Sequence, residues 1–200
     1  MILIIGIAFN FIIFLYQFIL HKKKEEFKLT IKHEILMFGF ISTIQTICFV
    51  LNKNVNLIFL LGITYLVIQA YTDFKTQFVY RFISYIFILI DSIMIIIYHQ
   101  NICASQLIIL IFIVFFIVCS IAGVFGWGDT ISISATIPIY LISYGPNAVV
   151  LFFMSFFCST ITFVVFNLAK KTKRNPFMPH WLGGYLLAYF LLFAYDKLII

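Results

Sequence analysis

The chain has 200 residues, of which 64% are hydrophobic and only 10% are charged, and its mean hydropathy of +1.15 excludes a soluble globular domain. Long Ile, Leu and Phe runs without alternating polar residues favour helices over a transmembrane barrel. The net charge of +6 comes from basic residues that gather in particular loops, which indicates membrane topology and not nucleic-acid binding. We therefore expect an all-α, polytopic transmembrane helix bundle.

About eight apolar segments follow one another, each roughly 16 to 22 residues long and so near the length that a bilayer core requires. The first segment, residues 1–20, has no basic stretch before it and no small-residue cleavage site after it, so we interpret it as a retained helix and not as a signal peptide. The predicted helices are residues 1–20, 34–51, 57–72, 82–98, 104–125, 130–145, 147–168 and 181–197.

The loops between these segments form two alternating sets. The basic set comprises His21–His33, Asp73–Arg81, the turn Gly126–Asp129 and Lys170–Asn175. The other set comprises Asn52–Asn56, His99–Ser105 and Tyr144–Asn147, and its only Lys or Arg is Lys53. By the positive-inside rule, the basic set is cytoplasmic and both termini are outside.

We expect a single membrane-embedded domain over residues 1–200. Residues 1–56 would supply two accessory helices with a short basic cytoplasmic loop, and residues 57–200 would form the core that carries the motifs described below. The loop His21–His33 is too short to fold alone, and no internal repeat is present.

The four cysteines predict neither a metal site nor a disulfide framework. Cys48, Cys103, Cys119 and Cys158 are scattered among apolar stretches, without a Cys-x-x-Cys motif or a histidine at metal-ligand spacing. A bridge between Cys48 and Cys103, both predicted near the outer face, is a minor alternative. We expect no metal and no cofactor.

Three aspartates fall within or beside apolar segments, where an ionisable side chain is costly and is a functional candidate by default. Asp73 ends the third predicted helix and Asp129 ends the fifth, so both fall at the predicted cytoplasmic boundary. Asp91 lies nearer the bilayer midplane, where an interhelical contact and a proton or ion pathway both remain open. Depth therefore pairs Asp73 with Asp129.

Aspartic proteases use a pair of carboxylates as their catalytic groups. Like charges in a low-dielectric site cannot both ionise, so the pair shares one proton. The ionised carboxylate can draw a proton from water as the water attacks a peptide carbonyl, while the protonated one donates to the carbonyl oxygen, and no metal is required.

The glycines before Asp129 have an expected role in this chemistry. Gly126 and Gly128 remove Cβ atoms and allow backbone angles that a helix excludes, so the chain could open and let an extended peptide approach Asp129 closely. The alternative is that Asp129 only caps the helix that follows.

Three patches of the sequence resemble the prepilin peptidases, also called type IV leader peptidases, which are membrane aspartic proteases of the GxGD type. "YTDFKTQFVYRF" (residues 71–82) is similar to the family's first aspartate motif, "GWGD" (126–129) to its second and "NPFMP" (175–179) to its third. The resemblance covers about residues 57–195. It implies that Asp73 and Asp129 are catalytic, and that the motif and substrate-cleft residues are Gly126, Gly128, Lys75, Pro176, Phe177 and Pro179.

The chain departs from the family pattern at several places. Tyr80 stands where the family usually has proline, and Ile131 stands where a lysine is common. Family members that also methylate carry a larger insert with cysteines where this chain has only His21–His33, so we expect no methyltransferase activity. These departures leave the substrate and its cleavage-site preference open.

The resemblance implies an aspartic-type endopeptidase, multi-pass in a bacterial plasma membrane, that cleaves the short leader of type IV prepilin-like or competence-pilin precursors at the cytoplasmic boundary. Its partners would be the precursor peptide and the lipid bilayer, not nucleic acid, and its oligomeric state is open. Two alternatives remain: a GxGD protease for other membrane peptides, and a non-catalytic ion-coupled transporter or scaffold in which Asp73, Asp91 and Asp129 carry protons or ions.

Overall fold

The computed structural model describes residues 3–4, 6–8, 10–12, 31–51, 57–77, 79, 81–98, 104–123, 126–144, 147–170 and 175–199. Within these ranges all regular secondary structure is helical, which confirms the predicted all-α class for the described residues. The helices are α2 (Ile31–Leu51), α3 (Leu57–Thr76), α4 (Arg81–Tyr98), α5 (Ala104–Ile121), α6 (Trp127–Ser134), α7 (Ile137–Tyr144), α8 (Ala148–Lys170) and α9 (Met178–Ile199).

Three of the described helices are long and apolar enough to cross a membrane. They are α2 from Lys32 onward, α3, and α8 as far as Ala169. Helix α5 also exposes large apolar side chains, with Ile111 64% and Ile121 70% exposed. Water would penalise such a surface and lipid would solvate it, so these features indicate a membrane protein.

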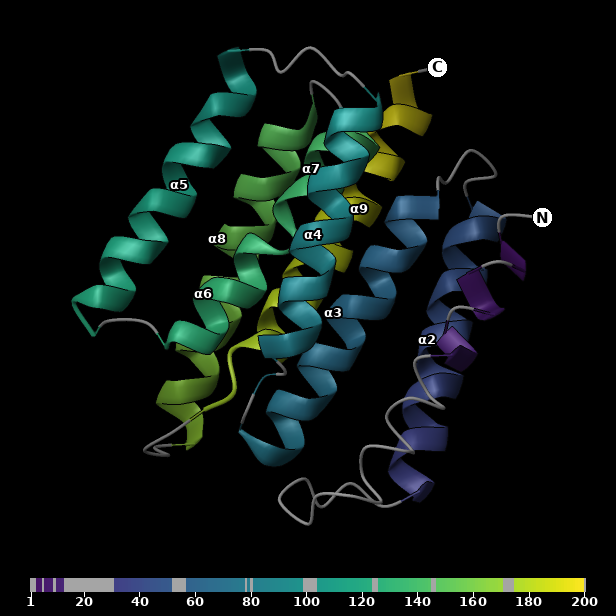
Figure 1. Ribbon diagram of the computed structural model, residues 1–200, viewed down its shortest axis with the longest axis horizontal. Helices are drawn as coiled ribbons and strands as arrows, with labels where there is room; N and C mark the ends of the chain where they lie inside the picture. Colours follow the sequence, from purple (N-terminus) through teal and green to yellow (C-terminus); the bar gives the residue numbers. More distant parts are fainter. Residues whose placement is uncertain are drawn as a thin grey trace.

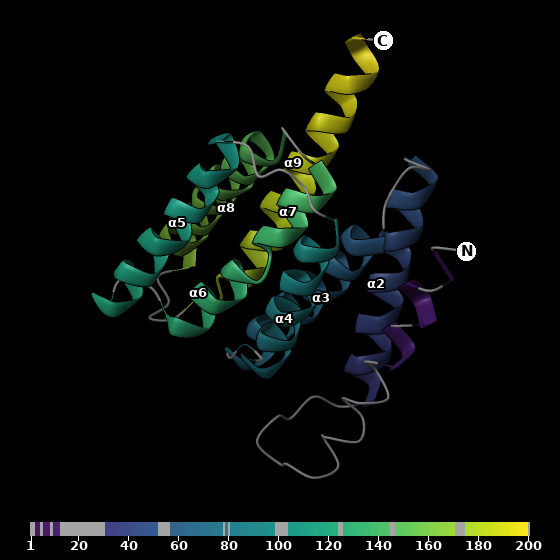
Figure 2. The ribbon, with the colours of Figure 1, turned by 45° about the horizontal axis from the view of Figure 1, so that its top comes forward.

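Helix α3 is at the centre of the bundle (Figure 1). In the most apolar part of α3, 78% of the residues are buried, whereas the corresponding shares in α2 and α8 are 33% and 22%. Helix α3 packs against α2, α4, α7 and α9, and α9 also packs along α8. Figures 1 and 2 show α2 on one flank of the bundle and α5 on the other.

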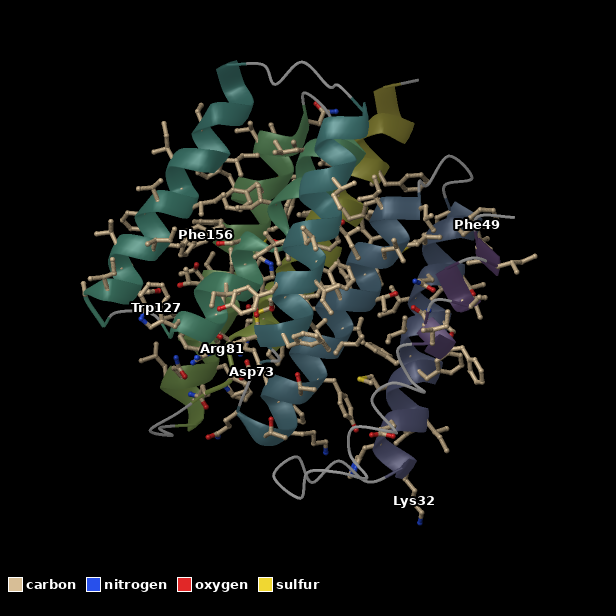
Figure 3. The ribbon with its side chains drawn as sticks, viewed as in Figure 1. Lys32, Phe49, Asp73, Arg81, Trp127 and Phe156 are labelled. Atoms are coloured by element: carbon tan, nitrogen blue, oxygen red, sulfur yellow. The ribbon has the colours of Figure 1, made fainter. Side chains whose placement is uncertain are left out.

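The C-terminal end of α3 and the N-terminal ends of α4, α6 and α9 lie at the same end of the bundle (Figure 1). Figure 3 shows Lys32, Asp73, Arg81 and Trp127 toward this end and Phe49 toward the opposite one. Lys75 belongs to the last turn of α3 and therefore lies at this end as well. We call it the basic end, after Lys32, Lys75 and Arg81. The predicted cytoplasmic charges at 21–30 and 171–174 lie outside the described residues.

The predicted single helix over residues 130–145 is wrong. The structure has two short helices here, α6 and α7, separated by a turn at Ala135 and Thr136. The backbone N–H of Thr136 donates to the carbonyl of Ile133 at 2.9 Å, which tightens the end of α6. Pro138 has no N–H to donate to the carbonyl of Ser134, so an unbroken helix across α6 and α7 would lose this hydrogen bond, whereas the first turn of α7 accommodates proline.

The predicted position of Asp129 at the end of the fifth helix is also wrong. Helix α5 ends at Ile121, and Gly123, with φ of +76°, turns the chain in a conformation that favours glycine. Asp129 instead lies in the first turn of α6.

The other predicted boundaries differ from the observed ones by a few residues. The third helix runs on to Thr76 and not to residue 72, so Asp73 lies inside its last turn. In the predicted first helix, the described residues 3–4, 6–8 and 10–12 are helical. Its remaining residues lie outside the described part of the chain.

Helices α8 and α9 approach each other closely at Gly184. A Cβ atom placed on this residue would lie 2.5 Å from the carbonyl oxygen of Ser155 and 2.9 Å from the backbone nitrogen of Ser159. A Cβ on the preceding residue, Gly183, would meet no atom within 4 Å. The close packing of the two helices therefore requires glycine at position 184 but not at position 183.

Gly184→Ala is expected to lower the free energy of unfolding by about 1–3 kcal/mol, because the added methyl group must displace α8. Gly183→Ala is the matched control and should be neutral or stabilising, since alanine is preferred over glycine in a helix. Thermal unfolding of both variants in the same detergent measures the difference. Equal unfolding midpoints would contradict the close approach at Gly184.

Candidate active site

Asp73 joins the end of α3 to the start of α9. Its side chain is only 5% exposed, and its Oδ2 accepts the backbone N–H of Met178 at 2.9 Å. The backbone N–H of Phe177 also donates to this carboxylate. These N–H groups begin α9 and have no acceptor within that helix, so Asp73 caps α9 from another helix.

Asp129 is the third residue of α6. The helix is preceded by Gly126, its N-cap, which is in an extended conformation with φ of −68° and ψ of 137°. The alternative that Asp129 itself is the N-cap residue is therefore wrong. The position places a partly exposed carboxylate in the first turn, near the positive end of the helix dipole.

The two glycines of the motif provide space. A Cβ on Gly128 would overlap the side chain of Val79, and a Cβ on Gly126 would lie 3.1 Å from Oδ2 of Asp129. The predicted importance of the missing Cβ atoms agrees with these contacts. The predicted non-helical backbone is present at Gly126, which is extended, but not at Gly128, which lies within α6. Their missing side chains let the α3–α4 connection and the Asp129 carboxylate lie close to the backbone.

Asp73 and Asp129 line one cavity of about 650 Å³ at the basic end. The two side chains interact electrostatically, so the charge of one acts on the other. The walls come from the end of α3, the start of α4, the first turn of α6, one residue of α8 and the segment before α9. The lining residues are Asp73, Gln77, Val79, Arg81, Gly126, Trp127, Gly128, Asp129, Phe163, Asn175, Pro176 and Phe177.

Six of the eight predicted site residues line this cavity, and Lys75 and Pro179 do not. Lys75 is exposed on α3, and its Nζ lies 5.6 Å from the centre of the Phe74 ring. Pro179 is the second residue of α9 and is partly buried. Of the predicted site residues, Asp73 of the first motif and Pro176 and Phe177 of the third therefore line the cavity.

The sequence prediction missed several cavity residues, among them Gln77, Arg81 and Asn175. Each is polar and lies within or beside a motif patch, which is the signal that could have identified it. Gln77 has φ of +58°, a left-handed conformation that is uncommon for a residue with a side chain. Phe163 comes from α8, which carries no motif, and only the packing of α8 brings it to the cavity.

Asp91 lies in α4, ten residues after Arg81 and hence about 15 Å along the helix. Its side chain lies outside the described part of the structure.

Cys48, Cys119 and Cys158 are free thiols, and Cys103 lies outside the described residues. Among the described side chains, no group of three His, Cys, Asp or Glu residues is arranged to hold a metal ion.

No family model, no curated protein and no solved structure matches this chain.

The cap that Asp73 gives to α9 predicts a difference between two replacements. Asp73→Asn keeps an oxygen that can accept a backbone N–H, whereas Asp73→Ala removes every acceptor. We expect the free energy of unfolding of the alanine variant to be about 1–2 kcal/mol lower than that of the asparagine variant. Thermal unfolding in detergent provides the measurement, and equal stability of the two variants would exclude the cap.

Proposed function

We propose that this protein is a membrane aspartic endopeptidase that uses Asp73 and Asp129 as its catalytic pair. The observation that supports the proposal most directly is that two carboxylates from separate helices line one cavity at the basic end. Two electrostatically interacting carboxylates in a poorly solvated site share a proton, which supplies one base and one acid at the same place.

Different surroundings suggest different roles for the two carboxylates. The backbone N–H groups of Phe177 and Met178 donate to Asp73, and such donors stabilise its ionised form. In the proposed mechanism Asp73 therefore takes the proton of the attacking water. Asp129 holds the shared proton and donates it to the oxygen of the scissile carbonyl.

The proposed substrate is a peptide bond at the cytoplasmic edge of the membrane, in a prepilin-like precursor with a short leader and an apolar helix. The cavity supports this choice because it combines apolar and polar walls. Val79, Trp127, Phe163 and Phe177 can receive an apolar residue beside the scissile bond, while the carboxylates reach the bond itself. The basic residues gather in one of the two alternating sets of loops. This pattern supports a protein of the bacterial plasma membrane whose site faces the cytoplasm and whose termini both lie outside.

The test is processing of a co-expressed, tagged precursor that has a short basic leader followed by an apolar helix. Asp73→Asn and Asp129→Asn should each reduce processing by at least about 100-fold, the scale of a lost acid or base. Asp91→Asn is the matched control and should process normally. All three variants must accumulate in the membrane to the same level as the unmodified protein.

Full processing in either Asp73→Asn or Asp129→Asn would overturn the proposal. Cleavage of a different membrane peptide with the same dependence on both residues would keep the chemistry and change the substrate.

An ion-coupled transporter is the second candidate, favoured by the break between α6 and α7. Paired short helices in place of one spanning helix also occur where transporters bind ions. In that case the cavity would hold a proton or cation in place of a peptide, and Asp91 would belong to the pathway. Uptake driven by a proton or sodium gradient in vesicles, lost in Asp91→Asn as well as in the other two variants, would favour this candidate.

A further inference from the structure

Four fully buried polar side chains form a hydrogen-bonded cluster that connects α3, α4 and α6. The hydroxyl of Tyr65 lies 2.8 Å from Oγ of Ser84, and Nε2 of Gln69 donates to the same Oγ at 3.0 Å. Tyr65 also donates to the carbonyl oxygen of Ser132 at 3.2 Å, and the hydroxyls of Ser84 and Ser132 lie 3.4 Å apart. All four side chains are 0% exposed. We call this group the polar bridge.

The polar bridge lies one helical turn from each carboxylate. Gln69 precedes Asp73 by four residues on α3, and Ser132 follows Asp129 by three residues on α6. Residues at these spacings share one face of a helix and are separated by about 5 Å along its axis. The bridge therefore joins the faces of α3 and α6 that carry the two carboxylates.

Helix α6 depends on such contacts for its position. It has only eight residues, too few to be stable without tertiary packing. It packs against α4 and α5, and the hydroxyls of Ser120 and Thr130 are hydrogen-bonded on the α5 side. The polar bridge connects α6 to α4 through Ser84 and to α3 through the hydroxyl of Tyr65. Water does not compete for these buried groups, so their geometry is well defined.

We infer that Tyr65, Gln69, Ser84 and Ser132 are positioning residues that set the separation of the Asp73 and Asp129 carboxylates; this inference rests on the proposed function. The bridge does not contact the reacting atoms. It holds α3 and α6 at the spacing at which both carboxylates can act on one water molecule, and a displacement on the order of 1 Å costs about 100-fold in rate.

Tyr65→Phe and Ser84→Ala test the inference, since each removes a shared hydroxyl and leaves most of the packing. The Tyr65 ring lies 4.6 Å from that of Phe87, a contact that phenylalanine keeps. With the precursor of the processing assay, kcat should fall at least about 10-fold while KM stays within about twofold. The double variant should be no slower than the slower single variant, because both changes disrupt one network.

Thr64→Val provides a matched control on the same helix. Thr64 is equally buried and belongs to a separate cluster, in which its Oγ1 donates to Oδ1 of Asn10 at 2.5 Å and accepts from Nε2 of Gln45 at 2.9 Å. This cluster connects α3 with α2 and residue 10, not with α6. Thr64→Val should lose stability but keep the kcat of the unmodified protein.

A distance measurement tests the inference without enzyme activity. Spin labels attached through Lys75→Cys and Trp127→Cys, in a protein with its four native cysteines replaced, report the separation of the α3 end from the α6 start. A narrow distance distribution is expected in the parent and in Thr64→Val, with a broader or shifted one in Tyr65→Phe. Unchanged distances and kcat in Tyr65→Phe would overturn the inference, whereas changed distances in a protein that processes no precursor would overturn only the proposed function.

Discussion

The carboxylate of Asp73 accepts the backbone N–H groups that begin α9, and the arrangement of the cavity depends on this contact. It ties the largely buried helix α3 to the segment Asn175–Phe177, which forms one wall of the cavity. Because helix ends in an apolar medium need internal partners for their backbone groups, the contact stabilises the fold and positions a candidate catalytic group at the same time. A stability role and a chemical role at Asp73 are therefore compatible.

The second carboxylate is positioned by different means. Asp129 lies on a helix of eight residues, and hydrogen bonds hold that helix on two sides, to Ser120 of α5 and to the buried Tyr65 and Ser84 of α3 and α4. Gly128 lets the connection at Val79 lie against the first turn of the helix. Asp129 therefore reaches the cavity from a short helix that these contacts hold in place. Asp73 reaches the same cavity and is fixed by its hydrogen bonds to the backbone at the start of α9.

The sequence predicted most of the helical segments and paired Asp73 with Asp129, which line one cavity, because apolar run length and loop charge can be read directly from the residues. It did not predict the break between α6 and α7, although Pro138 marks it, since apolar composition continues through the turn. Cavity residues such as Phe163 could not be predicted, because only the packing of α8 selects the face that reaches the site. The spatial role of Gly128 likewise depends on Val79, which is remote in the sequence.

The central claim is that Asp73 and Asp129 occupy one site, and bridging by mercury tests it most directly. Asp73→Cys and Asp129→Cys are combined in a protein without its native cysteines, treated with Hg²⁺ in the membrane and assayed for thiols that no longer react with maleimide. The pair Ser84→Cys and Ser132→Cys, at positions where the native hydroxyls lie 3.4 Å apart, serves as the positive control. We predict protection in both double variants and in neither aspartate single variant. Protection of the control pair alone would contradict a shared carboxylate site.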